Sequence, residues 1–252
     1  PRVVCARLRE AGANEVVLLE GWRAGRAAAR YSILCCAPRA ILTERDGVFY
    51  QWRREDDVWS AVEEPVSWLR ARYERARSHD TGSSRDPLER GDVPFVSGLV
   101  GALGFEFAWH LDRVDAPMQT PRAPMLWVGD FGCAAIYFHD AEDPESGRWR
   151  QVGDADDPAW DLLGGAIEDG AALGGRGLVG AGTESPRRPA LCRPERDGQA
   201  AYRARVQEAI DAIVERGDLF EVNYAERFEI DWQQSGFALY EALCEVASGE
   251  HF

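Results

Sequence analysis

The spacing of apolar residues changes abruptly at Gly217, and this change narrows the folds that the chain can adopt. Before it, apolar residues recur every three or four positions from 199 to 216, which predicts an amphipathic helix that ends at the glycine. After it, apolar and polar residues alternate from Phe220 to Trp232, which predicts a half-buried strand. A further helix is predicted from Phe237 to the end of the sequence. The tail therefore mixes helix and strand.

The first quarter of the chain carries four short apolar runs of the kind that form strands. Asp46-Gly47 separates the third run from the fourth and predicts a tight hairpin, because glycine tolerates the positive φ of such a turn. The apolar period then becomes three and four over 62–76, which predicts an amphipathic helix with Pro65 in its first turn. The four runs are Val16–Glu20, Tyr31–Cys36, Ala40–Thr43 and Val48–Trp52.

Two longer apolar blocks follow at 95–107 and 125–138, and their glycines predict bends or close backbone contacts. The stretch 147–194 is rich in glycine and contains the acidic run 154–157. It is predicted to be a loosely packed crossover with one weak helix near 160–167. The expected organisation is an N-terminal region at 1–150, a glycine- and proline-rich crossover at 151–198, and a third region at 199–252.

The composition argues against several kinds of partner. A net charge of −14 and a pI of about 4.8 oppose nucleic acid at long range, although a local basic pocket can still hold a small anion. No apolar run approaches the roughly 20 residues of a membrane helix, so no membrane partner is expected. The six cysteines and four histidines lack metal-ligand spacing, which favours buried, reduced thiols in a cytoplasmic protein and no metal site.

The residues alone offer few candidates for chemistry. Glu106 lies within an apolar stretch, where an acid can serve catalysis, but a lone carboxylate is more often structural. Arg30-Tyr31 precedes a predicted strand and could present a guanidinium to a carboxylate, although a surface ion pair is the commoner outcome. No phosphate loop, nucleophile elbow or zinc motif occurs. These observations predict an α+β domain without an assigned function.

Several segments, in order, resemble the first component of anthranilate synthase and of aminodeoxychorismate (para-aminobenzoate) synthase. Together they cover most of the chain, and the last is the most specific. The segments are Leu18-Leu19-Glu20-Gly21, Arg30-Tyr31-Ser32-Ile33-Leu34 with Ala37-Pro38, 94–106 (Pro94 to Glu106), Ala123-Pro124-Met125, and Tyr202 with 217–228 (Gly217-Asp218-Leu219-Phe220-Glu221-Val222-Asn223-Tyr224 and onwards).

The resemblance implies an α+β fold: the N-terminal part of the anthranilate synthase component I-like fold, with two packed, mainly antiparallel sheets flanked by helices. It also implies a truncated chain, in which 199–252 begins a chorismate-binding region. The carboxylates that hold Mg²⁺ and the acid that protonates the departing hydroxyl would lie beyond Phe252. No catalytic or metal-binding residue is therefore assigned, and no Mg²⁺ is expected on this piece. The complete enzyme would use Mg²⁺, chorismate and ammonia from a glutamine amidotransferase partner.

The resemblance further implies an amino-acid pocket, regulatory or structural in role. The family builds it from a Leu-Leu-Glu-Ser motif, an Arg-aromatic pair and a later Pro-aromatic pair. Gly21 stands where the family has the serine, and His251 stands where it has the proline. Loss of a ligand-bonding hydroxyl costs about 1–3 kcal/mol, so feedback by tryptophan is expected to be weak or missing. The matching positions are Leu19, Glu20, Gly21, Ala28, Ala29, Arg30, Tyr31, His251 and Phe252.

Two branches of metabolism stay open. The missing hydroxyl at Gly21 and the Glu-Val-Asn sequence ending at Asn223 favour aminodeoxychorismate formation for folate. Anthranilate formation for tryptophan is the alternative within the same resemblance. A third possibility is that the chain binds an amino acid or docks the glutaminase without catalysing a reaction.

Overall fold

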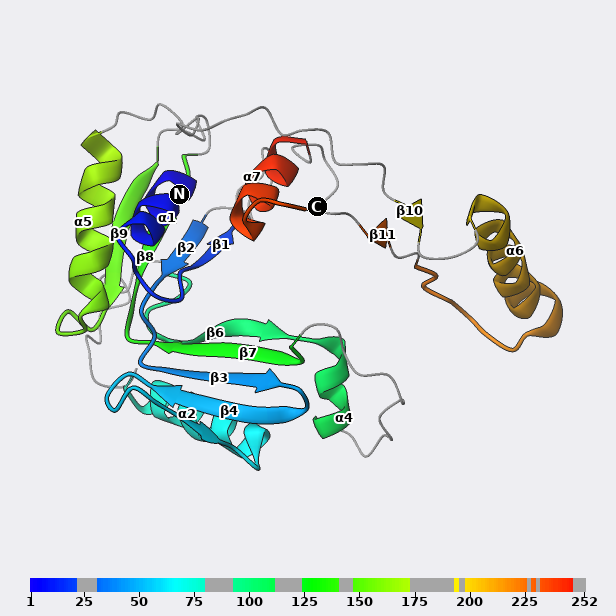
Figure 1. Ribbon diagram of the computed structural model, residues 1–252, viewed down its shortest axis with the longest axis horizontal. Coiled ribbons are helices and arrows are strands. Elements are labelled where there is room, and N and C mark those ends of the chain that lie inside the picture. The colour runs from blue at the N-terminus through cyan, green and yellow to red at the C-terminus, as the bar shows by residue number, and fades with distance from the viewer. Residues whose placement is uncertain are drawn as a thin grey trace. The chain divides into compact units, whose positions relative to one another are not determined.

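The computed structural model describes residues 1–21, 31–79, 93–111, 124–140, 147–172, 193–194, 198–225, 228–229 and 232–246. The chain forms two compact units, Pro1–Leu178 and Val179–Phe252 (Figure 1). The first unit contains both large sheets and the site described below. The division falls within the stretch predicted to be a crossover.

The first sheet is antiparallel, with strand order β1-β2-β8-β9. Its inner strands are the most deeply buried, since residues 133–137 of β8 are all buried. Helices α1 and α5 pack against each other, and α5 also contacts β8 and β9, so this helical layer covers the sheet on the side away from the second sheet. The elements are α1 (Arg2–Glu10), β1 (Val17–Glu20), β2 (Tyr31–Cys35), β8 (Cys133–Phe138), β9 (Arg148–Gly153) and α5 (Ala159–Ala172).

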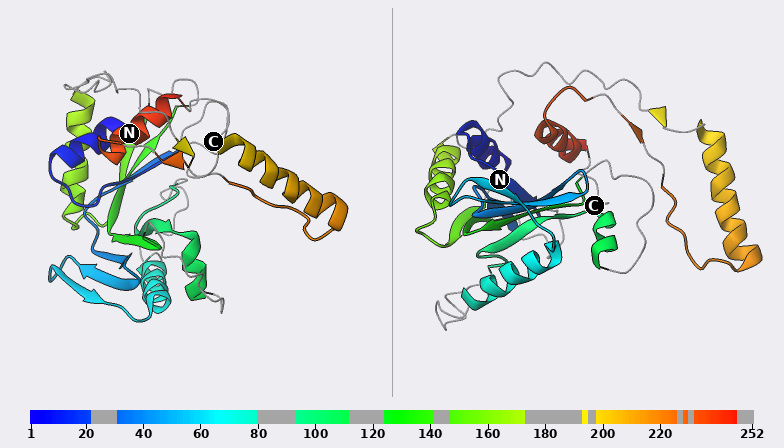
Figure 2. Two further views of the ribbon diagram at one scale, coloured as in Figure 1. Left: turned by 45° about the vertical axis from the view of Figure 1, so that its right-hand side comes forward. Right: turned by 60° about the horizontal axis from the view of Figure 1, so that its bottom comes forward.

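The second sheet is also antiparallel, with strand order β5-β4-β3-β7-β6. Helix α2 lies across one of its faces, as Figures 1 and 2 show, and a short 3₁₀ turn η1 and helix α4 follow β6. The elements are β3 (Ala40–Arg45), β4 (Val48–Arg53), β5 (Val58–Ala61), α2 (Pro65–His79), β6 (Gly98–Leu103), η1 (Phe105–Phe107), α4 (Ala108–Leu111) and β7 (Leu126–Phe131).

Two apolar cores hold these layers together. One lies between the sheets, where Cys35, Ala134 and Ile136 of the first sheet meet Val100 and Phe131 of the second. The other lies under α2, where buried strand residues such as Leu42 and Val128 receive apolar side chains of the helix. Burial of this apolar surface is the main stabilising term. The predicted pair of packed, mainly antiparallel sheets flanked by helices is confirmed.

The predicted hairpin at Asp46-Gly47 joins β3 to β4. Both turn residues have positive φ, 53° and 80°, as a two-residue turn of the primed type requires. The buried carboxylate of Glu44 completes the turn, because it accepts hydrogen bonds from the amide of Gly47 and, at 3.1 Å, from that of Met125. Local turn chemistry thus fixes the register of the two strands.

The prediction of a loose crossover after Gly147 is wrong for β9 and for the close packing of this segment, whereas the helix predicted near 160–167 is confirmed as α5. Strand β9 pairs with β8 along its whole length, and Leu163 of α5 is completely buried. Helix α1 was also not predicted; it buries Val4, Cys5 and Leu8. The first sheet therefore has β9 as an unpredicted edge strand, and α1 joins α5 in the helical layer that covers this sheet.

In the second unit, α6 (Gly198–Asp211) continues as a π-helical turn, η2 (Ala212–Arg216), and ends at Gly217 with a φ of 66°. The amide of Asp218 closes this end by donating to the Ala212 carbonyl at 2.9 Å. The glycine stop is therefore confirmed, as is a helix near the end, α7 (Gly236–Val246).

The strand predicted at 220–232 is wrong over most of its length. Residues 220–225 form no strand, and Phe220 is fully exposed. Within the described part of this stretch, β11 (Phe228–Glu229) is the only strand, and it pairs with β10 (Arg193–Pro194). Among the described residues, the alternating pattern is thus present without long neighbouring strands that would bury one of its faces.

Candidate functional site

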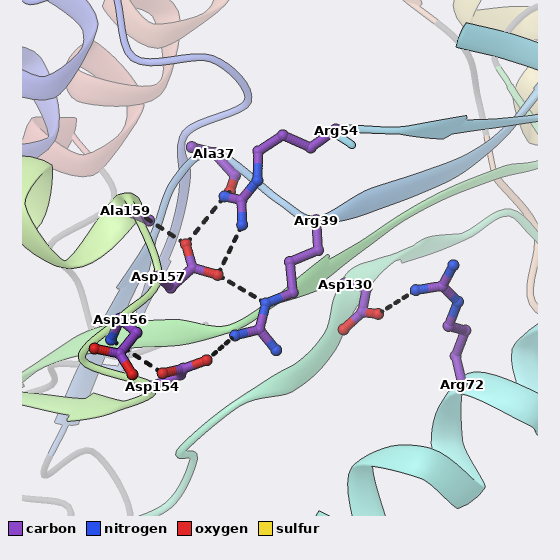
Figure 3. A network of polar contacts seen from close by, with 9 residues as sticks. All are labelled: Ala37, Arg39, Arg54, Arg72, Asp130, Asp154, Asp156, Asp157 and Ala159. Atoms are coloured by element: carbon purple, nitrogen blue, oxygen red, sulfur yellow. Dashed lines mark hydrogen bonds and ion pairs between the residues drawn. The ribbon is translucent and has the colours of Figure 1, made fainter. Parts of the chain in front are cut away.

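A buried carboxylate, Asp157, ties the two sheets of the first unit together (Figure 3). It lies between β9 and α5, and its side chain is 1% exposed. Arg54, just after β4, donates to both carboxylate oxygens at 3.0 and 2.9 Å. Arg39, just before β3, donates from Nε at 2.7 Å. Two arginines from the second sheet thus converge on one acid from the first.

The same carboxylate begins helix α5. Its Oδ1 accepts a hydrogen bond from the amide of Ala159 at 3.0 Å, and its backbone carbonyl accepts one from Trp160 at 2.8 Å. Asp is a favoured N-cap because it satisfies amides that have no partner inside the helix, and Pro158 suits the first helical position. Asp157 therefore links helix initiation to the contact between the sheets.

The pKa of Asp157 reflects two opposing effects. Burial alone raises the pKa of this carboxyl, but hydrogen bonds from Arg54, from the amide of Ala159 and from Arg39 outweigh it, so the pKa is lowered from its usual value. Asp157 is consequently ionised at neutral pH and does not donate a proton. It positions the arginines.

Neighbouring charges extend this network. Asp154 accepts a hydrogen bond from the second terminal nitrogen of Arg39 at 2.5 Å and holds the turn through the amide of Asp156 at 3.0 Å. Arg72 of α2 pairs with Asp130 of β7 at 2.8 Å, and each of these two side chains is 16% exposed. Arg39, just before β3, and Arg72 of α2 are thereby each held in place by aspartates (Figure 3).

A cleft of about 660 Å³, which we call the arginine cleft, opens beside this network in the first unit. It combines charged side chains with glycine backbone and apolar residues. Its lining is Arg39, Arg72, Tyr73, Arg75, 93–99, 130–132, Gly153 and Asp154. Such an arrangement can bind and orient a small polar molecule. Among the described residues, no three or more His, Cys, Asp or Glu side chains are grouped so that they could hold a metal ion.

The structure brings together three of the predicted amino-acid-pocket residues. Leu19 pairs with Ile33 across β1 and β2, so Leu19 and Tyr31 share one face of the sheet, the face turned toward the core between the sheets. Gly21 is close to the same point, because a Cβ placed on it would lie 2.3 Å from the Tyr31 carbonyl oxygen. Tyr31 also packs edge-on against Phe138, with ring centroids 5.2 Å apart.

Glu20 does not join them. It pairs with Ser32 and so projects from the opposite face, where Arg2 of α1 donates to its two oxygens at 3.1 and 2.8 Å. Ser32 is completely buried and shares a 2.7 Å hydrogen bond with Nε2 of His139. Glu20 therefore anchors α1 to the sheet. The other predicted pocket residues, Ala28, Ala29, Arg30, His251 and Phe252, lie outside the described residues.

Sequence reasoning missed the Asp157 network. Its members are 103 and 118 residues apart, so no local pattern connects them. One local signal was present in the sequence. Asp157-Pro158 before an apolar run predicts the start of a helix, with Asp157 at the N-cap position. The other sequence candidate, Glu106, lies half-buried in η1.

Comparison with known proteins supplies the family. A family model described as chorismate binding enzyme matches residues 37–249, which is most of the chain. This chain therefore belongs to the chorismate-binding enzyme family. Anthranilate synthase component 1 of Arthrobacter globiformis is 28% identical over 240 residues, and that of Geobacillus stearothermophilus is 26% identical over 261 residues.

A solved structure has the same fold. The crystal structure of anthranilate synthase component I from Streptococcus pneumoniae TIGR4 matches with a TM-score of 0.54 at 19% identity, over 90% of this chain. The chain spans about half the length of its relatives: 42% and 49% of the two curated proteins, and 47% of the solved one. Within the described residues, no helix is both long and apolar enough to cross a bilayer.

Proposed function

We propose that the complete protein containing this chain aminates chorismate with ammonia supplied by a glutamine amidotransferase partner. The observation that carries this proposal is the match of residues 37–249 to the chorismate-binding family. Both curated relatives are anthranilate synthase components, which supports a synthase over a protein that only binds chorismate. Residues 1–252 would supply the N-terminal region and the start of the chorismate-binding region.

Anthranilate is the better supported product, because both relatives carry that name. Aminodeoxychorismate is the second candidate and is favoured by the glycine at position 21 and by Asn223. The two reactions share the amination of chorismate, and only the first releases pyruvate. Purified complete protein with chorismate, Mg²⁺ and ammonium therefore distinguishes them: anthranilate with equimolar pyruvate supports the first, and an amine without pyruvate supports the second.

Mg²⁺ belongs to this proposal on the strength of the resemblance alone. The described residues contain no group that fits a metal ion, so none of them is assigned to Mg²⁺. Omission of Mg²⁺ from the assay, with EDTA present, is expected to abolish product formation. Product formed at an unchanged rate without Mg²⁺ would contradict this part of the proposal.

We also propose that regulation by tryptophan is weak or absent. A side chain at Gly21 would collide with the Tyr31 carbonyl oxygen, so a serine hydroxyl cannot be restored there without moving the backbone. Titration calorimetry of the complete protein with L-tryptophan is expected to give no saturable heat at micromolar concentrations. A micromolar dissociation constant would contradict this proposal and leave the proposed reaction untouched.

A further inference from the structure

We propose that strand β6 forms an interface with β6 of a second copy of this chain. β6 is the last strand of the second sheet, and it is bonded to β7 on one side (Figure 1). Among the described residues, no strand pairs with its other side. An open strand edge presents unpaired N–H and C=O groups and is a template for another strand. No step of the proposed function involves this edge.

The register of β6 on β7 identifies the groups that face the open edge. The amide of Gly104 donates to the Met125 carbonyl at 2.8 Å, directly after the last pair of the ladder. Hydrogen-bonded pairs alternate along an antiparallel ladder, so the even-numbered residues of β6 bond to β7. The N–H and C=O groups of Leu99, Gly101 and Leu103 therefore point away from β7.

β6 lacks the features that usually protect a strand edge. Natural edges commonly carry charges, proline or bulges. β6 contains no proline, and no charged residue occurs from Val93 to Phe105, although 29% of the whole chain is charged. Residues 101–103 are exposed to solvent. At the opposite edge of the same sheet, β5 is shorter, and the guanidinium of Arg45 lies 4.5 Å from the ring centre of its Trp59.

The sequence of β6 is compatible with itself in an antiparallel pair. Outward-facing residues must meet outward-facing residues, so a two-fold axis at Gly101 pairs Leu99 of each copy with Leu103 of the other. No like charges oppose each other in this register, because every residue of β6 is uncharged. In a chain with a net charge of −14, such a stretch is where two copies repel each other least. The interface closes after two copies.

The same pairing would cover exposed apolar side chains. Leu103 is 59% exposed, and Phe105, just beyond β6, is 87% exposed. Leu99 already packs partly against the core under α2. In the symmetric register, Leu103 of each copy lies beside Leu99 of the other, at the border of this core. Burial of apolar surface on both sides of the axis therefore adds to the backbone hydrogen bonds.

Light scattering after size exclusion tests the proposal on the full chain carrying Phe220→Ser, which removes the exposed phenylalanine of the second unit. The mass is expected to rise from monomer to dimer, and no further, as the protein concentration increases. Leu103→Lys is expected to weaken the dimer about a hundredfold, roughly tenfold at each of the two contacts that the axis relates. Val58→Lys is the matched control, because Val58 is 53% exposed on β5, and it should leave the dimer unchanged.

Amide hydrogen exchange read by NMR locates the interface. Dimer formation is expected to slow exchange at Leu99, Gly101 and Leu103 by about tenfold or more. A chain that stays monomeric would overturn the proposal, as would equal effects of Leu103→Lys and Val58→Lys, or a dimer in which these three amides exchange as fast as in the monomer. Protection of the same amides in a monomeric complete protein would also overturn it, because the edge would then be covered within one molecule. Because no probe is chorismate, these outcomes are independent of the proposed function.

Discussion

Arg54 holds both carboxylate oxygens of Asp157, at 3.0 and 2.9 Å, across 103 residues of sequence. The pair joins the end of β4 in the second sheet to the start of α5 over the first. Because Arg39 donates to the same acid, one buried charge is matched by two cations and by the amide of Ala159. Removing the acid would leave both arginines without their common partner.

Asp157→Asn is therefore expected to destabilise the first unit by about 3 kcal/mol. This is the low end of what breaking a buried pair costs, because the Arg54 and Arg39 side chains remain 29% and 39% exposed. Urea unfolding followed by tryptophan fluorescence measures the loss. Asp156→Asn, an exposed neighbour, is the control and should change stability by less than about 0.5 kcal/mol. Equal effects of the two variants would contradict the role given to Asp157.

The lowered pKa of Asp157 predicts a pH dependence of stability. A carboxyl whose pKa is lower in the folded state contributes stability above its unfolded pKa, about 3.9 for Asp, and loses it as the pH falls through the folded value. The free energy of unfolding is expected to fall below about pH 4 with a steeper slope in the wild type than in Asp157→Asn. Parallel curves for the two proteins over pH 3–5 would contradict the assignment.

The buried thiols should be inert in the folded chain. Burial raises the pKa of Cys36 to about 12 and that of Cys133 to about 12, and it also raises the pKa of Cys35. Since the thiolate is the reactive form, these three should resist iodoacetamide at pH 8 until the chain unfolds, whereas the half-buried Cys244 reacts. Mass mapping of labelled peptides checks this, and rapid native labelling of Cys36 would contradict it.

Two glycine substitutions should act with opposite sign. Gly132→Ala places a Cβ 2.2 Å from the Asp157 carboxylate and 2.4 Å from the Arg39 guanidinium, so it is expected to destabilise by about 1–3 kcal/mol. Gly165→Ala lies within α5 with nothing within 4 Å of the new Cβ, and it should stabilise by about 0.5–1 kcal/mol. Thermal melts measure both. Destabilisation by Gly165→Ala equal to that by Gly132→Ala would count against these contacts.

The exposed apolar residues of the second unit predict self-association. Phe220 is fully exposed and Val214 is 75% exposed, and apolar side chains left in water favour aggregation. The 252-residue chain is expected to show concentration-dependent light scattering that Phe220→Ser reduces. The same substitution at an already polar exposed site, Glu221→Ser, is the control. A monodisperse monomer with a sharp cooperative melt would contradict the expectation.

Local signals predicted most of the first unit. The turn at Asp46-Gly47 was predictable because the φ values it needs depend on two adjacent residues. Strand β9 was not, because Arg148, Trp149 and Arg150 lack the apolar alternation of a half-buried strand, and β9 is an edge strand whose burial comes mainly from Val152. Whether such a segment forms a strand depends on its pairing and packing with distant residues and not on its own apolar pattern.

The candidate site was less accessible to sequence reasoning than the fold. The run Asp154–Asp157 has the composition of a solvated loop, yet Asp157 is buried because two distant arginines neutralise it. Buried charges are tolerated only when paired, and pairing over 103 residues leaves no local pattern. In the tail, by contrast, a clear alternation from Phe220 onwards predicted a long strand, and the described residues of that stretch form only the short strand β11.

Nitrogen transfer to chorismate tests the central claim most directly. The complete protein, incubated with chorismate, Mg²⁺ and ¹⁵N-ammonium, is expected to yield an aromatic or dienyl amine that carries one ¹⁵N, as read by mass spectrometry. The amount should rise in step with the chorismate consumed. Chorismate left intact, or converted to products that contain no ¹⁵N, would contradict the account.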